Sequence, residues 1–297
     1  MHTFITARAV PTALLLGALV AAGCGQSADD APVQGSLSIQ LSRSRVALGS
    51  PVDVTYRFTL AGDAAGIGAR KVFVHFMDAN GEQMWTDDHE PPTPTTAWKP
   101  GQAVEYTRTV FAPVYPYVGQ AAIVAGLYDP ANGERVRLAG TDAGGRAYEA
   151  ATFELLPQTE NIFLIFKDGW HAVESAADNS MVEWQWTKKE ATLAFRNPRR
   201  DAVLYFQADN PSKAATAATS VELRLGDQVL TTVPLGAEGA VLKIPLTAAA
   251  MGGGDMVELR FVVDQTFVPA LEPGTQSNDP RELGARVFHA FVQPQGS

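Results

Sequence analysis

The chain has 297 residues, and its 23 basic and 32 acidic side chains give a formal net charge of −9. This balance argues against nucleic acid and anionic lipid headgroups as partners, because both require a basic face. With 46% hydrophobic and 19% charged residues, the chain is globular in composition rather than disordered. Its length suits two domains of ordinary size.

The N-terminal segment contains an apolar run that follows Arg8 and ends in small residues and a cysteine. The run is too short to span a membrane as a helix, and its layout is typical of a signal peptide. The residues Ala21-Ala22-Gly23-Cys24 resemble the lipobox of bacterial lipoproteins, in which the cysteine is lipidated and becomes the first residue. Ala21 stands where this family usually has a larger aliphatic side chain.

The resemblance implies a signal peptide over residues 1–23, a lipid anchor on Cys24 and a small, polar tether over residues 24–35. Cys24 is the only cysteine, so lipidation would also account for an unpaired thiol in an exported protein. The alternative is a buried cysteine after an ordinary signal peptide. The resemblance further implies the bacterial cell envelope. Gly25, in place of the aspartate that retains lipoproteins in the inner membrane, favours the outer membrane.

Alternation of apolar and polar residues begins at Ser36 and predicts a series of short strands. Lys71–Met77 is apolar on both faces apart from His75, which predicts a central strand. Asp78-Ala79-Asn80-Gly81 then predicts a tight hairpin turn. Seven or eight such strands with Gly/Pro turns predict an immunoglobulin-like β-sandwich over residues 36–157.

A short polar break at Pro157–Glu160 predicts a domain boundary, and the strand pattern restarts at Ile162. We expect a second β-sandwich of jelly-roll type over residues 160–294, with Ala248–Met251 as a single helical turn ended by glycines. No repeat of 20–50 residues occurs, so solenoids and propellers are excluded. The predicted fold class is therefore all-β, with two tandem sandwiches after a signal peptide.

Sequence motifs for catalysis and for nucleotide cofactors are missing, and we expect no catalytic residue and no cofactor. His75, His89, His171 and His289 lie far apart, and His75 and His289 fall within strands, where a hydrogen-bonded structural role is expected. Asp87-Asp88-His89-Glu90 is the densest group of possible metal ligands. Adjacent side chains of an extended segment point alternately apart, so no metal site is expected there.

Three tryptophans offer a possible glycan-binding surface. Trp184 and Trp186 are two residues apart and share one face of a strand, and Trp170 precedes them. Exposed aromatic rings on one face can stack on sugar rings. The favoured interpretation is that Trp184 and Trp186 pack into the core while the polar residues between them face water.

The residues before the last strand form a helix-start pattern, with Asp279 as the N-cap, a proline at the first position and Glu282 reaching back. This predicts one helical turn in which Arg281 makes a structural ion pair, with Asp264 as a candidate partner. The D-x-R-x-L-G pattern also resembles a segment of β-sandwich modules found with bacterial polysaccharide-handling and glycosyltransferase proteins. That resemblance implies no catalytic residue here.

These features together favour a lipid-anchored envelope protein that binds or scaffolds and has no enzymatic activity of its own. Its expected partner is an envelope glycan or another envelope protein. The alternative is a carbohydrate-active hydrolase whose carboxylates converge only in the fold. A convergent Asp/Glu pair in a cleft would favour the hydrolase, whereas an aromatic patch without such a pair would favour binding.

Overall fold

The computed structural model divides the chain into two compact units, Met1–Pro32 and Val33–Ser297, and the second unit contains all the strands of the described residues. The predicted signal peptide and Cys24 lie outside the described residues. In the part of the chain that is described, no helix is long and apolar enough to cross a membrane. The structure describes residues 31–62, 66–177, 179, 182–212, 219–236, 239, 241–272, 274 and 276–296.

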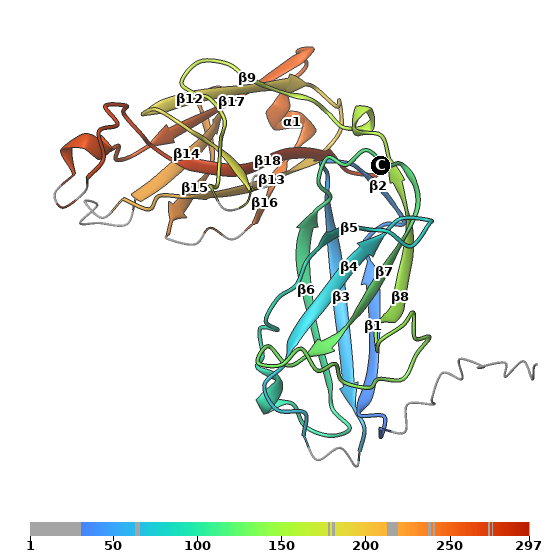
Figure 1. The fold of residues 1–297 in the computed structure, drawn as a ribbon. Helices are drawn as coiled ribbons and strands as arrows, with labels where there is room; N and C mark the ends of the chain where they lie inside the picture. The colour runs from blue at the N-terminus through green and yellow to red at the C-terminus, as the bar shows by residue number, and fades with distance from the viewer. Residues whose placement is uncertain are drawn as a thin grey trace, which may run out of the picture. The chain divides into compact units, whose positions relative to one another are not determined.

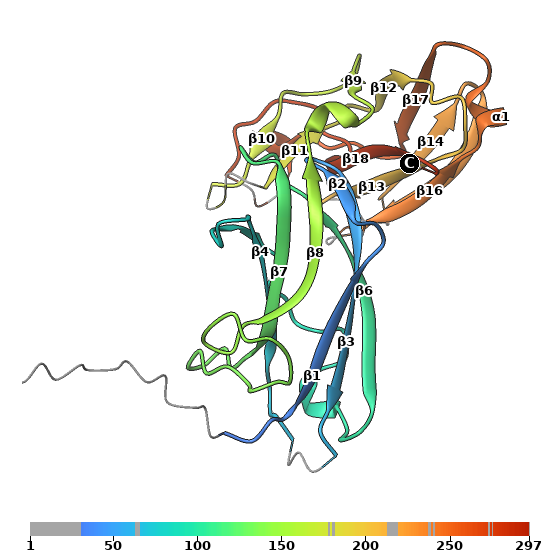
Figure 2. The same ribbon diagram turned by 90° about the vertical axis from the view of Figure 1, so that its right-hand side faces the viewer.

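The strands up to Leu156 form a three-stranded sheet of order β1-β3-β6 and a five-stranded sheet of order β2-β8-β7-β4-β5 (Figure 1). Their bounds are β1 (Gly35–Leu41), β2 (Arg45–Ala47), β3 (Pro51–Leu60), β4 (Lys71–Met77), β5 (Gln83–Thr86), β6 (Ala103–Phe111), β7 (Gly119–Tyr128) and β8 (Tyr148–Leu156). β1 pairs antiparallel with β3, whereas β2 pairs parallel with β8. The first two strands, β1 and β2, thus lie at the edges of different sheets, which Figure 2 shows as separate layers.

The burial of individual strands explains why this sandwich forms. Alternate residues of β3, from Val52 to Leu60, are buried and face the core between the sheets. β4 is covered on both faces, because Phe73 packs with Val124 and Ala147 on the side away from that core. The predicted central strand is therefore confirmed.

The strands from Leu164 onward form two more sheets, of order β10-β11-β18-β13-β16 and β15-β14-β17-β12-β9. Strands β11 to β18 follow the jelly-roll order, β11-β18-β13-β16 in one sheet and β12-β17-β14-β15 in the other. Their bounds are β9 (Leu164–Phe166), β10 (Glu174–Ser175), β11 (Glu183–Trp186), β12 (Glu190–Arg196), β13 (Ala202–Asp209), β14 (Thr219–Leu225), β15 (Gln228–Leu235), β16 (Leu242–Leu246), β17 (Met256–Val263) and β18 (Arg286–Pro294).

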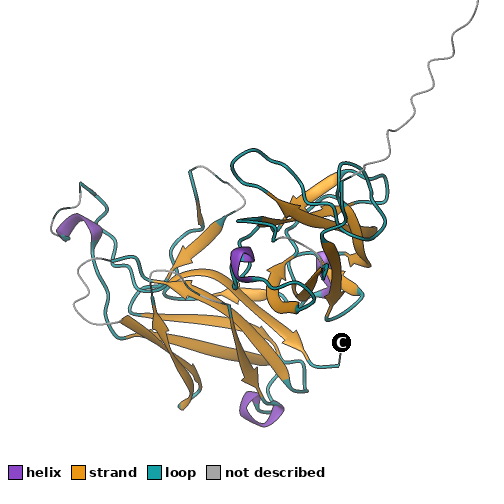
Figure 3. Cartoon of the chain, turned by 90° about the horizontal axis from the view of Figure 1, so that it is seen from below, coloured by secondary structure: helices purple, strands orange, loops and turns teal. Residues whose placement is uncertain are grey.

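A second core lies between these two sheets and includes Phe195, Phe206 and Phe261, none of which is exposed. The predicted helical turn is α1 (Ala248–Met251), where the Thr247 hydroxyl accepts a hydrogen bond from the Ala250 amide. The described residues also form short 3-10 turns at η1 (Thr95–Ala97), η2 (Gln158–Glu160) and η3 (Pro269–Leu271) (Figure 3). The all-β prediction is confirmed.

Candidate functional site

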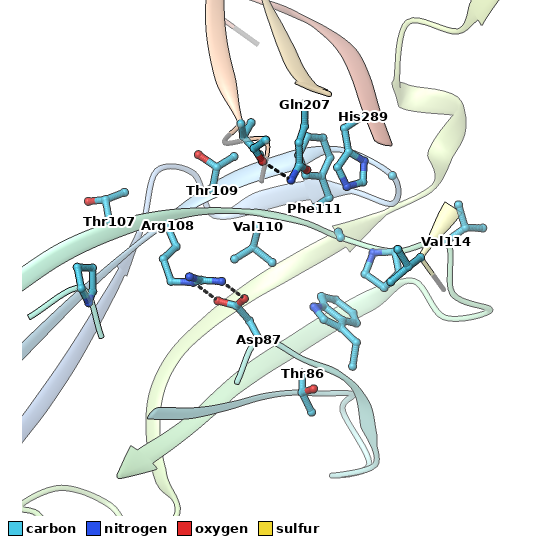
Figure 4. Close-up of a pocket in the computed structure, with 18 residues that line it drawn as sticks. Thr86, Asp87, Thr107, Arg108, Thr109, Val110, Phe111, Val114, Gln207 and His289 are labelled. Atoms are coloured by element: carbon cyan, nitrogen blue, oxygen red, sulfur yellow. Dashed lines mark hydrogen bonds and ion pairs between the residues drawn. The ribbon is translucent and has the colours of Figure 1, made fainter. Parts of the chain in front are cut away.

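A pocket of about 890 Å³ lies where β6 and the residues after it approach β13 and β18 (Figure 4). This volume is within the range of small-molecule sites. Its lining combines aromatic rings with hydroxyl, amide and guanidinium groups. The pocket is therefore the leading candidate for a functional site in the described part of the chain.

One wall of the pocket contains an ion pair between Asp87 and Arg108. The Arg108 Nε and Nη2 atoms donate to the two Asp87 carboxylate oxygens at 2.9 and 2.8 Å, and the Tyr56 hydroxyl donates to the same carboxylate at 3.1 Å. The hydrogen bonds from Arg108 to Asp87 raise the pKa of Arg108, and burial raises the pKa of the Tyr56 hydroxyl. The Asp87 carboxylate is thus held in place by three hydrogen bonds.

His89 extends this network into the first sandwich. Its Nδ1 lies 2.7 Å from the Asp87 carbonyl oxygen, and its Nε2 lies 2.8 Å from the Tyr106 hydroxyl. Since a carbonyl oxygen only accepts, the Nδ1 carries the proton and Nε2 accepts from Tyr106. Burial lowers the pKa of His89, which favours this neutral ring. His89 is therefore a structural residue.

The segment from Asp87 to Glu90 has the alternation expected from its extended backbone. Asp88 points away from Asp87, accepts a hydrogen bond from the Val74 amide at 2.9 Å and lies 3.8 Å from His75. Glu90 pairs with a lysine at the strand edge. Across the described residues, no group of three or more His, Cys, Asp or Glu side chains converges to hold a metal ion.

Aromatic rings form the other part of the pocket lining. Trp85 stacks on Phe76, with ring centroids 4.5 Å apart, and its shielded indole Nε1 makes no hydrogen bond within the described residues. Phe111 and His289 stack at 3.9 Å with their planes 8° apart. Burial lowers the pKa of His289 to about 4, so the ring is neutral at pH 7. His289 was predicted to be a hydrogen-bonded strand residue, and the described structure instead shows it stacked at the pocket.

The strand register places Trp184 and Trp186 on the outer face of their sheet. Gln185 lies opposite Val287, which belongs to the core, so Trp186 and its partner Arg286 point the other way. Trp186 is buried, as the favoured interpretation expected, but by Phe267 on the outer face rather than between the sheets. The prediction that the two tryptophans share a face is confirmed, and so is the burial of Trp186, whereas Trp184 is only partly buried.

Arg286 lies among three aromatic rings on this outer face. Its guanidinium carbon is 5.3 Å from the Trp184 ring centroid, 5.8 Å from that of Trp186 and 5.0 Å from that of Phe288. The same guanidinium donates to the buried Asp209 carboxylate at 2.7 and 2.6 Å. These two hydrogen bonds hold the Arg286 guanidinium in place, and it makes cation–π contacts with the rings. We call Trp184, Trp186, Arg286 and Phe288 the aromatic platform.

A β-bulge connects the aromatic platform with the pocket. Gln207 lies opposite His289 and Ala208 lies opposite Val287, so Phe288 is an extra residue in β18. As a result Phe288 packs against Trp184 in the platform, while His289, its neighbour in sequence, lines the pocket. Bulges commonly re-aim side chains near functional sites. No motif in the sequence indicates this bulge.

The predicted helix-start box forms a different structure. The Asp279 side chain accepts a hydrogen bond from the Arg281 amide, two residues later, at 3.0 Å. This bond closes a turn, and no helix follows. The Arg281 guanidinium pairs with Asp279 at 2.7 Å and with Glu174 at 2.6 Å, which raises its pKa. Glu282 accepts from a threonine hydroxyl instead of reaching back. Asp264 accepts a hydrogen bond from the Ser220 hydroxyl, so the prediction that Asp264 is the partner of Arg281 is wrong.

Trp170 lies apart from the aromatic platform. Its ring packs edge-on against Phe261 in the second core, at 5.3 Å between centroids, and its Nε1 donates to the Thr192 carbonyl at 2.8 Å. Phe166 contacts the same ring. Trp170 therefore packs the fold, and the structure does not bring it together with Trp184.

Comparisons with known proteins give no family. No family model matches the chain, and no curated protein matches it. The CARDB domain of a Pyrococcus furiosus protein in complex with di-metal ions has 13% identity and a TM-score of 0.26, over 42% of this chain and 96% of that one. Bacteroides uniformis β-glucuronidase 2 has 8% identity and a TM-score of 0.29, over 88% of this chain but 30% of that one. Likenesses at TM-scores this low carry no argument about function.

Proposed function

We propose that this protein binds a neutral carbohydrate of the bacterial cell envelope in the pocket, and that it is held at the envelope by a lipid on Cys24. The observation that carries the proposal is the pocket lining, where the Trp85 ring and the stacked Phe111–His289 pair occur together with polar side chains. A sugar ring has apolar C–H faces that pack on aromatic rings and hydroxyl groups that need hydrogen bonds.

The polar lining retains hydrogen-bonding capacity for such a ligand. Thr109 donates its hydroxyl proton to Asp53 at 2.7 Å and keeps oxygen lone pairs to accept with. Gln207 donates one N–H to the Gly239 carbonyl at 2.8 Å, which leaves its second N–H and its carbonyl oxygen. Because Arg108 is paired with Asp87, this wall offers polarity without net charge. These features support an uncharged, hydroxyl-rich ligand.

Asp87 is the only carboxylate in the described pocket lining, and Arg108 and Tyr56 already bind it. Glycoside hydrolysis in its usual form needs two carboxyl groups that flank the scissile bond. The pocket does not present that pair, so its geometry favours binding over hydrolysis.

Screening the soluble protein on a glycan array tests the binding proposal. Protein from Gln26 onward contains the whole compact unit Val33–Ser297. It should bind at least one neutral glycan, and Trp85→Ala, which removes the ring, should weaken that binding about tenfold, the effect of one aromatic contact. Phe163→Ala removes an exposed ring beside β9 and serves as the matched control. Binding of no glycan, or equal binding by wild type and Trp85→Ala, would contradict the proposal.

Metabolic labelling with palmitate tests the lipid anchor separately. The wild-type protein should incorporate the label and fractionate with membranes, whereas Cys24→Ser should do neither because it lacks the acceptor thiol. Equal labelling of the two proteins would exclude Cys24 as the anchor.

A further inference from the structure

We infer that the carbohydrate site is elongated, continuing from the pocket onto the aromatic platform, so that its ligand is an oligosaccharide chain rather than a single sugar. This inference rests on the proposed function of the pocket. It adds a second place for sugar rings, formed by Trp184 and Phe288, and specifies a neutral chain that occupies both places at once.

Two strands connect the pocket to the platform. On β18, the bulge places Phe288 on the platform and the adjacent His289 in the pocket lining. Just before β11, Val182 lines the pocket, and Trp184 follows two residues later on the same face of the extended chain. Two residues of extended chain rise about 7 Å. A ligand that leaves the pocket along the outer face therefore meets Trp184 and Phe288 next.

The platform has open aromatic surface. Trp184 and Phe288 are both partly exposed, with ring centroids 6.0 Å apart and planes at 62°, whereas Trp186 is covered by Phe267. The Trp184 indole Nε1 is shielded and has no hydrogen-bond partner within the described residues. Trp85 in the pocket has the same property. Each end of the inferred site contains a partly exposed indole ring on which a sugar ring can stack.

The platform is rigid, because the fork of Arg286 on Asp209 fixes the cation that lies among its rings. Ion pairs also lie on the outer face. Glu174, opposite Trp184, accepts from Arg281 at 2.6 Å, and Lys243 pairs with Asp53 at 2.6 Å. An acidic glycan would have to compete with these carboxylates for the cations. These carboxylates therefore disfavour an acidic glycan, and a neutral chain is expected.

Calorimetric titration with oligosaccharides of graded length tests the inference on the protein from Gln26 onward. The probes are glucan, mannan, galactan and chitin fragments of two and of six sugars, together with uronic-acid oligomers of six. For the neutral series that binds, the six-sugar fragment should bind about tenfold more tightly than the two-sugar fragment, as expected for one added aromatic contact. The uronic-acid oligomer should bind more weakly than the neutral six-sugar fragment.

Variants separate the two parts of the site. Trp184→Ala should reduce binding of the six-sugar fragment to the level of the two-sugar fragment and leave the latter unchanged, and Trp184→Phe should keep most of the gain. Trp85→Ala should weaken both fragments, and Phe163→Ala neither. A thermal melt of each variant shows that it is folded.

The outcomes distinguish this inference from the proposed function. If Trp184→Ala affects neither fragment, or both equally, the elongated site is wrong. In that case a weakening of binding by Trp85→Ala would still support the pocket proposal. A preference for the uronic-acid oligomer overturns the neutral assignment. Failure of every fragment to bind overturns the pocket proposal, and the elongated site with it.

Discussion

Removal of the Asp87 carboxylate should destabilise the first sandwich, because this side chain joins three elements of it. Asp87 follows β5, Tyr56 belongs to β3 and Arg108 belongs to β6. The Asp87 side chain is 14% exposed, the Tyr56 residue is fully buried, and the Arg108 side chain is 37% exposed. Asp87→Ala removes the carboxylate that accepts from the buried Tyr56 hydroxyl and from the Arg108 guanidinium.

The two losses differ in size because their exposure differs. An orphaned buried hydroxyl costs about 1–3 kcal/mol. The ion pair contributes about 1 kcal/mol or less, because water can reach Arg108 and solvate its guanidinium when the carboxylate is gone. Together the expected loss in the free energy of unfolding is about 3 kcal/mol. Asp87→Asn retains an oxygen that can accept from Tyr56, so its expected loss is about 1 kcal/mol.

Thermal melts followed by circular dichroism measure these losses. A shift of about 2–4 °C per kcal/mol predicts a midpoint lowered by about 6–12 °C for Asp87→Ala. Glu105→Ala breaks the Arg57–Glu105 pair, whose side chains are 57% and 53% exposed, and should leave the midpoint unchanged. If Asp87→Ala melts like Glu105→Ala, the network does not stabilise the fold. If Asp87→Asn is as damaging as Asp87→Ala, the charge rather than the Tyr56 acceptor is what matters.

Two further measurements test other residues. Burial lowers the pKa of His289 to about 4, below about 6.5 in the unfolded chain, so its neutral form contributes fully above pH 6.5 and the contribution is lost as the pH falls toward 4. The stability advantage of wild type over His289→Gln in urea should therefore shrink by up to about 3 kcal/mol across that window, and a pH-independent difference would contradict it. Arg281→Ala should cost about 1 kcal/mol, because the Arg281, Asp279 and Glu174 side chains are 36%, 25% and 32% exposed. A loss of about 3 kcal/mol or more, as for a buried pair, or a loss of glycan binding would refute that reasoning.

Much of the fold follows from local sequence periodicity. Alternation in β3 predicts which of its residues are buried, because the side-chain period of a strand is fixed by its geometry. The continuous apolar run of β4 predicts burial on both faces, which Phe73 provides together with Val124 on β7 and Ala147 just before β8. The helical turn α1 is predictable for the same reason, since Thr247 and Gly252 mark its two ends locally.

The candidate site depends on long-range pairing that local patterns do not encode. Spacing shows that Trp184 and Trp186 share a face, but the side of the sheet is decided by the pairing of Gln185 with Val287, about a hundred residues away in sequence. Similarly, an aspartate such as Asp279 can cap a helix or close a turn on its own backbone. The hydrogen bonds between Leu283 and Phe267 hold this segment extended, and the turn forms instead.

The bulge at Phe288 shows how one irregularity serves both the fold and the inferred site. Val287 and Val292 are five residues apart, an odd number, and would face opposite sides of a regular strand. Both nevertheless lie in the second core, because the extra residue shifts the phase of β18 by one position. The same shift puts Phe288 and His289 on the outer face, one on the platform and one at the pocket. With apolar residues in both phases of β18, the sequence fits either register, and the distinction is made by pairing with β13, where Gln207 faces out and Ala208 faces in. The outward position of Phe288 beside His289, which joins the platform to the pocket, is therefore determined by strand pairing rather than by a motif.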